Sequence, residues 1–354
     1  MHFRNINQLK KSLNFKLLVR NNSYFKIFIK KYTKSFSKYY YSYAPKYLKT
    51  TIHKFVSLES LQQSINHNLF TAVYFELRTR CNGTCSFCAA SVQNEARPDI
   101  CMDFELYKKA ILELADMNYN GIIAFHVNSE PLLIKNIDEY IVFARKKLKD
   151  SWIQILSNGK SLNSVNGKKI IEAGIDELSL NIYNDNLKAK LPKNIIKFEK
   201  EVLYKLFDKK QIYAGHKNNR PRGKFINYNI FRRLLNEILT NRAGSSPNKK
   251  SNKPILGNYG FCEYPFRQFN ITANGNVSQC CCDLNFSNSM GNIKFQSIQE
   301  VWKGKKFTDL RKNLLNGTRE TSSLCSKCDF FGLQKPPKNL FRKAFYYLLK
   351  HNEV

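Results

Sequence analysis

Apolar runs alternate with amphipathic stretches through the middle of this chain. The apolar runs have the length of buried strands, and between them apolar residues recur at helical spacing. The predicted strands are Thr71–Leu77, Gly121–Val127, Trp152–Leu156 and Glu177–Tyr183, and the predicted helices are 103–118, Ile137–Leu148 and Lys168–Ala173. Strands that alternate with helices indicate βαβ units, so the pattern predicts an α/β fold with a parallel sheet.

The pattern weakens over residues 184–256, which are strongly basic. Only Phe231–Leu239 keeps a helical spacing of apolar residues there. We expect this region to hold the remaining elements of the sheet together with an irregular basic insertion.

The C-terminal region has a different pattern. Asn274-Gly275 lies between the apolar segments Phe266–Thr272 and Asn276–Cys280, which is a strong β-hairpin signal. Ile298–Leu315 then has an apolar face at helical spacing, as does the short basic segment 338–350. The hairpin and the first helix predict a small separate unit. The last segment is expected to pack on the protein, with a membrane surface as the alternative.

Charge adds two open questions. The chain of 354 residues has a net charge of +31, and residues 1–58 carry 13 Lys or Arg and no acidic residue. A basic surface fits nucleic acid or an anionic membrane, but the general abundance of Lys and Asn favours compositional drift, so nucleic acid is not the expected partner. Organelle targeting by the basic N-terminus is not excluded. No apolar run reaches the ~18 residues that span a bilayer.

Ten cysteines bring in chemistry, and they are clustered. This clustering does not resemble a disulfide framework and argues for a reducing compartment, so the predicted location is the cytoplasm. Cys81, Cys85 and Cys88 are spaced C-x3-C-x2-C directly after the first predicted strand. Three close thiolates can hold three irons of a [4Fe–4S] cluster and leave the fourth iron open for a ligand.

A second set of cysteines lies in the C-terminal unit. Cys262 precedes the hairpin, Cys280 ends it, and Cys325 and Cys328 form a C-x2-C pair. Together they can close a four-thiolate site. Cys282 is the alternative to Cys280, because alternate residues of a strand share a face.

These residues resemble the radical S-adenosylmethionine (SAM) superfamily. The triplet matches the superfamily's cysteine spacing, and Phe87 stands at its aromatic position. Asn128-Ser129-Glu130-Pro131 is similar to its Gly-Gly-Glu-Pro turn, although two glycines are replaced, and Ser157-Asn158-Gly159 is similar to its Thr-Asn-Gly. The C-terminal cysteines, with Gly275 and Trp302, are similar to a SPASM or twitch auxiliary-cluster domain.

The resemblance implies a partial (β/α)6 TIM-like barrel followed by a small β-hairpin and helix iron–sulfur domain. The implied boundaries are 1–68 for a basic extension, 69–256 for the barrel, 257–333 for the auxiliary domain and 334–354 for a basic tail. The second cluster would be an auxiliary [4Fe–4S] cluster. The implied residues that bind SAM are Phe87, Glu130, Ser157, Asn158, Ser179 and Asn181. The catalytic residues are unknown, with Arg242 and His126 as candidates.

The implied reaction is cleavage of SAM to a 5′-deoxyadenosyl radical that takes hydrogen from a small polar, sugar-like substrate. The auxiliary cluster would accept an electron, which gives a dehydrogenase, and flavodoxin or ferredoxin would be the electron donor. Two alternatives remain: a peptide-modifying maturase, and a non-catalytic iron–sulfur or nucleic-acid-binding protein.

Overall fold

The computed structural model describes residues 69–92, 95–213, 222, 224–236, 241–247, 262, 264–284, 286, 288–316 and 318–328. The basic N-terminal extension and the helix expected at 338–350 lie outside the described residues. Among the described residues, no helix is both long enough and apolar enough to cross a membrane.

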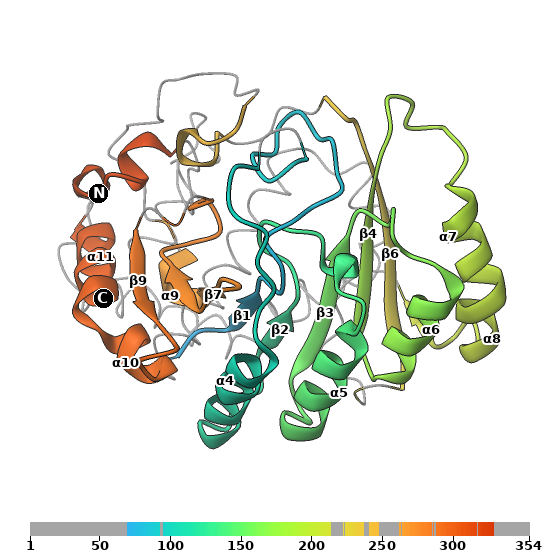
Figure 1. Ribbon diagram of the computed structural model, residues 1–354, viewed down its shortest axis with the longest axis horizontal. Helices are drawn as coiled ribbons and strands as arrows, with labels where there is room; N and C mark the ends of the chain where they lie inside the picture. Colours follow the sequence, from blue (N-terminus) through green and yellow to red (C-terminus); the bar gives the residue numbers. More distant parts are fainter. Residues whose placement is uncertain are drawn as a thin grey trace, which may run out of the picture.

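One sheet runs through the whole molecule (Figure 1). Its strand order is β5-β6-β4-β3-β2-β1-β7-β8-β9. Neighbours are parallel from β5 to β7, and β7-β8-β9 is antiparallel. The strands are β1 Ala72–Phe75, β2 Ile122–Ala124, β3 Trp152–Ser157, β4 Glu177–Tyr183, β5 Ile212–Tyr213, β6 Ile226–Arg233, β7 Gln268–Ile271, β8 Asn276–Ser278 and β9 Ser289–Asn292. The α/β class and the four expected strands are therefore confirmed.

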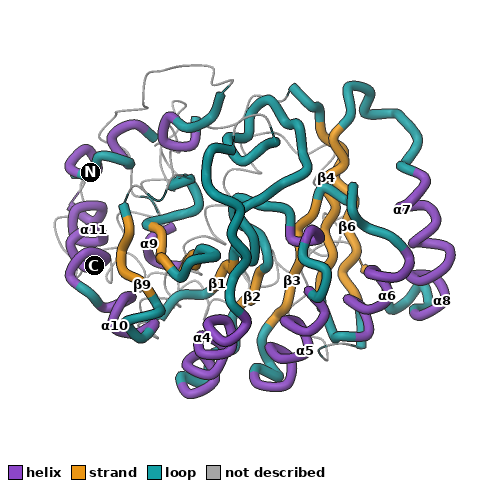
Figure 2. The backbone as a smooth tube through the Cα atoms, in the orientation of Figure 1, coloured by secondary structure: helices purple, strands orange, loops and turns teal. Residues whose placement is uncertain are grey.

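Helices connect the parallel strands, and α4, α5 and α6 lie in sequence along the sheet (Figure 2). The longer helices are α4 Phe104–Asp116, α5 Ile137–Lys147, α6 Ser164–Glu172 and α11 Lys305–Asn316, and the shorter ones are α7 Lys193–Phe198, α8 Tyr204–Leu206, α9 Tyr264–Arg267 and α10 Ile298–Lys303. A π-helical segment, η2 Glu199–Leu203, joins α7 to α8. Single 3-10 turns are η1 Pro131–Leu133, η3 Arg242–Gly244, η4 Arg319–Thr321 and η5 Cys325–Lys327.

Strand β1 shows how the sequence separates the two faces of the sheet. Val73 and Phe75 are fully buried, and the Phe75 ring lies 4.9 Å from the Tyr107 ring of α4. Because side chains alternate along a strand, Tyr74 and Glu76 lie on the opposite face. We call this the inner face, and it faces away from α4.

The C-terminal hairpin is confirmed, but it does not form a separate sheet. Strands β7 and β8 pair antiparallel around Asn274-Gly275, and Gly275 has φ +84°, a conformation that favours glycine. β7 also pairs in parallel with β1, so the hairpin continues the barrel sheet. A hairpin signal reports local turn geometry and carries no information about this long-range pairing.

Two expected helical segments were wrong in detail. Ile298–Leu315 is two helices, because Gly304 adopts an extended ψ of 159° and ends α10. Phe231 belongs to β6, which pairs with β4 from Glu177↔Asn227 to Tyr183↔Arg233. Seven strand partners outweigh the helical spacing of a few apolar residues there. Helix α6 also begins earlier than Lys168, because Asn163 and Asn166 form a capping box.

Candidate active site

The cysteine triplet lies in the loop that follows β1, at the carboxyl end of the parallel strands. Cys85 is buried, and Cys81 and Cys88 are half-buried. A Cβ at Gly83 would lie 3.2 Å from Cys81 Sγ and 3.8 Å from Cys85 Sγ, so both sulfurs converge on one point. A side chain at this position would therefore press on the Cys81 sulfur, which favours glycine there.

The thiols of the triplet crowd one another. Burial, with a contribution from the neighbouring thiols, raises the pKa of Cys81 and of Cys85 to about 11. Bound iron would offset the free-energy cost of deprotonating these thiols, since a metal-bound thiol is deprotonated. No group of three acidic, His or Cys side chains in the described part of the chain is close enough to share a single metal ion. Three thiolates at this spacing can instead hold three irons of a [4Fe–4S] cluster.

Glu130 ties the ends of β2 and β3 together. Its carboxylate is buried and accepts hydrogen bonds from Ser157 Oγ at 2.7 Å, Asn158 N at 2.8 Å and Leu132 N at 3.0 Å. Its own N–H donates to the Arg80 carbonyl, next to Cys81. The structure therefore brings Glu130, Ser157 and Asn158 together beside the triplet, as the sequence predicted.

Asn158 also reaches the triplet loop directly. Its Nδ2 donates to Asn82 Oδ1 at 2.8 Å and lies 3.7 Å from Cys81 Sγ. Phe87 is buried, with its ring 5.6 Å from that of Tyr183 at the end of β4. These contacts hold the loop against β3 and β4.

Two other residues predicted to bind SAM have other partners. Ser179 donates to Glu177 at 2.8 Å on β4, and Asn181 accepts a hydrogen bond from Arg233 Nε at 2.9 Å. Neither makes a hydrogen bond to the loop around Glu130 in the described structure, so their predicted role stays a prediction.

His126 follows β2, and its ring lies edge-on to Tyr74 at 5.3 Å. Burial lowers the pKa of His126 to about 4, so the ring is neutral at pH 7. This favours a hydrogen-bonding role over the transfer of protons near neutral pH.

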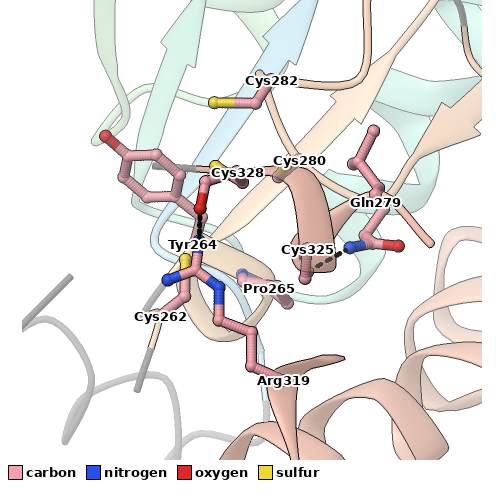
Figure 3. Close-up of a pocket in the computed structure, with 10 residues that line it drawn as sticks. Cys262, Tyr264, Pro265, Gln279, Cys280, Cys282, Arg319, Cys325 and Cys328 are labelled. Atoms are coloured by element: carbon pink, nitrogen blue, oxygen red, sulfur yellow. Dashed lines mark hydrogen bonds between the residues drawn. The ribbon is translucent and has the colours of Figure 1, made fainter. Parts of the chain in front are cut away.

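The second set of cysteines surrounds one pocket (Figure 3). Gln279 Nε2 donates to Cys325 Sγ at 2.9 Å, and Arg319 donates to the Cys328 carbonyl at 3.4 Å. The cysteines that line the pocket are Cys262, Cys280, Cys282, Cys325 and Cys328. This donor set fits an iron–sulfur cluster, with one thiol more than four-fold ligation needs.

Cys282 is the extra thiol in this arrangement. It packs with Cys280, Cys328 and Ala243, so both candidates for the same ligand position lie at the pocket. Cys281, between them, lies near Arg242 and near the inner face of the sheet. Burial raises the pKa of Tyr74 on that face to about 12, and the charge of a Cys281 thiolate adds to this increase.

We expect Cys280→Ser to lose about four irons per chain, because one [4Fe–4S] cluster would lose a ligand. Cys282→Ser is expected to keep them, since Cys280 has the spacing from Gly275 that the resemblance implies. Iron analysis after anaerobic reconstitution checks this, with exposed Cys101→Ser as the matched control. Loss of iron in the Cys282 variant alone would reverse the assignment.

Arg242 lies between the two sets of cysteines. It is half-buried, with Cys88 of the triplet and Cys281 and Cys282 near enough to raise its pKa against the opposing effect of desolvation. Its Nη1 lies 3.4 Å from Asn128 Oδ1. Arg242 and Ala243 have φ of 44° and 55°, which is strained for residues other than glycine.

The segment around Arg242 fastens both cysteine loops. Ser246 Oγ donates to the Phe87 carbonyl at 2.9 Å, and Asn241 Nδ2 donates to the Lys327 carbonyl at 2.8 Å. The strained backbone is therefore held at both ends, and it connects the triplet to the C-terminal pair.

Sequence reasoning missed a buried ion pair on the inner face. Glu76, at the end of β1, is paired by Arg97 Nη1 at 2.9 Å, and Arg97 Nη2 pairs with Glu95 at 2.7 Å. Burial raises the pKa of Glu76 to about 7, although Arg97 acts to lower it. The available signal was a glutamate within an apolar strand, which is rarely buried without a partner.

Glu76 predicts a pH dependence of stability. Glu76 keeps its proton up to about pH 7 in the folded state, whereas the ordinary pKa of a glutamate is 4.5, so the folded state binds more protons than the unfolded state between these pH values. Stability should therefore fall as pH rises through this window. We expect Glu76→Gln to make the fall in melting temperature between pH 5.5 and 7.5 smaller in the cluster-loaded protein. The exposed Glu105→Gln should follow the wild-type profile, and identical profiles for all three proteins would contradict the prediction.

Comparison with known proteins agrees with this geometry. Residues 262–329 match the family model of the SPASM iron–sulfur cluster-binding domain. The chain is 28% identical over 267 residues to the S-adenosyl-L-methionine-dependent 2-deoxy-scyllo-inosamine dehydrogenase of Niallia circulans, covering 75% of this chain and 95% of the relative.

Two solved structures are similar along most of the chain. The crystal structure of BtrN in complex with AdoMet and 2-DOIA has a TM-score of 0.58 and 26% identity, covering 77% of this chain and 97% of that one. An open conformation of BtrN has a TM-score of 0.50 and 25% identity, covering 74% and 92%. The C-terminal unit therefore matches a SPASM iron–sulfur domain, and most of the chain is similar to SAM-dependent radical enzymes. The expected cofactors, SAM, a [4Fe–4S] cluster and an auxiliary cluster, agree with these similarities.

Proposed function

We propose that this enzyme oxidises a carbinol carbon of a small polyhydroxylated ring, an aminocyclitol such as 2-deoxy-scyllo-inosamine, to the ketone. The observation that carries the proposal is the similarity along 95% of a dehydrogenase with that substrate. The arrangement of the two cysteine sets beside one half-buried arginine supports it, because such an oxidation needs two redox centres close to the substrate.

The electron balance explains the need for two centres. Oxidation of a carbinol to a ketone removes a hydrogen atom from carbon, a proton from oxygen and one further electron. When bound, SAM with the cluster at the triplet supplies hydrogen-atom abstraction, and the auxiliary cluster accepts the further electron. Cys81, Cys85 and Cys88 would hold the first cluster, and Cys262, Cys280, Cys325 and Cys328 would hold the second.

The chain's own polar residues position the reactants. Glu130 would accept charge-assisted hydrogen bonds from the amino group of SAM, held in place by Ser157 and Asn158. Arg242, which is half-buried and always charged, would donate to an oxygen of the substrate. A flavodoxin or ferredoxin would be the electron donor, and the cytoplasm would be the compartment that keeps the thiols reduced.

Anaerobic reconstitution with iron and sulfide tests the proposal. With SAM, a reductant and 2-deoxy-scyllo-inosamine, we expect 5′-deoxyadenosine and the ketone in equal amounts. Failure to form 5′-deoxyadenosine under any condition would contradict the enzymatic function. Formation of 5′-deoxyadenosine with a peptide alone would favour a maturase, and a steeply salt-dependent affinity for DNA or RNA would favour a nucleic-acid-binding protein.

A further inference from the structure

One row of residues crosses the inner face of the sheet in register. Tyr74 of β1 is aligned with Asn270 of β7 on one side. On the other side the alignment runs through Ala124 to Gln154, then to Glu177 and Asn227. We call these residues of six parallel strands the inner row: Asn227, Glu177, Gln154, Ala124, Tyr74 and Asn270.

The inner row is polar where a barrel interior is usually apolar. Ala124 is its single apolar member, and its small side chain leaves space in the middle of the row. Asn270 and Asn227 are only 1% and 3% exposed, so burying these amides costs free energy unless they form hydrogen bonds.

Several polar atoms of the row are buried without a hydrogen-bond partner: Asn227 Nδ2, Gln154 Oε1, and both Nδ2 and Oδ1 of Asn270. His126 Nδ1, two residues beyond Ala124, is also unpaired, and its ring contacts Tyr74. Asn270 is unusual among the described residues because both of its side-chain polar atoms are buried and unpaired. Buried polar groups in native proteins almost always have partners, and the described residues supply none for these atoms, so they are available to a bound molecule.

The unpaired atoms define the chemistry of that molecule. They include both donors and acceptors, which suits hydroxyl groups, because a hydroxyl donates and accepts at once. They do not suit a phosphate or carboxylate, which only accepts hydrogen bonds when ionised.

The β1 and β7 end of the row lies at the correct depth for the proposed reaction, whereas Glu177 is the first residue of β4 and Asn227 the second of β6. Tyr74 and Asn270 come one residue before the carboxyl ends of β1 and β7. Cys281, beside the auxiliary cysteines, is near enough to affect Tyr74. A ring held here lies below the loops that carry both sets of cysteines.

We propose that the inner row binds the substrate ring and that Asn270 holds two of its neighbouring polar groups, accepting from one at Oδ1 and donating to the other through Nδ2. This inference rests on the proposed function, because that function supplies the polyhydroxylated ring. It makes Asn270 a specificity-determining residue that binds substrate and takes no part in cleaving SAM.

The test uses Asn270→Leu in the cluster-loaded enzyme, with 2-deoxy-scyllo-inosamine as the probe. Leucine has a similar size and no polar atoms, so it removes both hydrogen bonds without leaving an unpaired group in the interior. Gln268→Leu is the matched control, because Gln268 lies on the same strand and face but one layer further from the cysteines, with one unpaired atom.

We expect Asn270→Leu to weaken binding of the probe by about 10- to 100-fold in calorimetry, as two hydrogen bonds are lost. KM for the probe should rise by a similar factor, while iron content and the binding of SAM stay at wild-type values. Gln268→Leu should change probe binding by less than about three-fold, since it lies below the row.

The outcomes separate this inference from the proposed function. Wild-type enzyme that binds the probe through Asn270 without oxidising it would uphold the inference and overturn the proposed function. Oxidation of the probe by the wild-type enzyme, together with an unchanged dissociation constant of the probe in Asn270→Leu, would uphold the proposed function and overturn the inference. Absence of probe binding to the wild-type enzyme would overturn the inference. The unpaired atoms of the inner row would then form hydrogen bonds with water only.

Discussion

Replacing Cys81, Cys85 and Cys88 together with alanine is expected to abolish 5′-deoxyadenosine formation. The remaining thiol between β1 and α4, Cys101, is exposed, so the variant keeps no group of thiols there that could hold iron. Iron content should fall from about eight to about four per chain, because one of two [4Fe–4S] clusters is lost. Iron analysis and chromatography of the reaction products measure both effects.

The matched control for this variant is Cys101→Ala, which removes an exposed thiol at the surface. It should keep the iron and the SAM cleavage of the wild-type enzyme. Residual 5′-deoxyadenosine from the triple variant would show that another group holds the catalytic cluster.

Replacing Cys325 and Cys328 with alanine should have an equally large but different effect. Iron content should again fall from about eight to near four per chain, because the auxiliary cluster would lose two of four ligands. SAM cleavage should continue, whereas formation of the ketone should stop, since the substrate's last electron has no acceptor. Product analysis separates the two steps.

Ser326→Ala is a suitable control, because it changes the same turn and leaves both thiols in place. If the iron content of the double variant does not fall, this site holds no cluster. If ketone formation continues at the wild-type rate, the auxiliary cluster is not the electron acceptor.

The two sets of residues differed in how far the sequence could predict them. Cys81, Cys85 and Cys88 are close in the chain, so their spacing alone restricts where the sulfurs can lie. Glu130, Ser157 and Asn158 follow successive strands, and the carboxyl ends of parallel strands meet at one edge of the sheet. Their convergence was therefore predictable once the βαβ pattern had been recognised.

Glu76, Arg97 and the inner row were not predictable in this way. Asn227, Gln154 and Asn270 are far apart in the chain, and each looks like an ordinary amide in a strand. Their alignment depends on the register of five strand pairings, and on β7 pairing with β1 rather than only with β8. Register is decided by packing of the apolar face and has no local signal in the sequence.

The amino-acid sequence by itself determined the α/β class, the cysteine triplet, the position of Glu130 after a neighbouring strand, and the resemblance to radical SAM enzymes, because each depends on short spacings or on the order of elements. Only the tertiary structure decided that the hairpin continues the barrel sheet, that Arg242 lies between the two cysteine sets, and that unpaired amides form one row. These features join residues far apart in the chain, and their positions are determined by the packing of the whole fold.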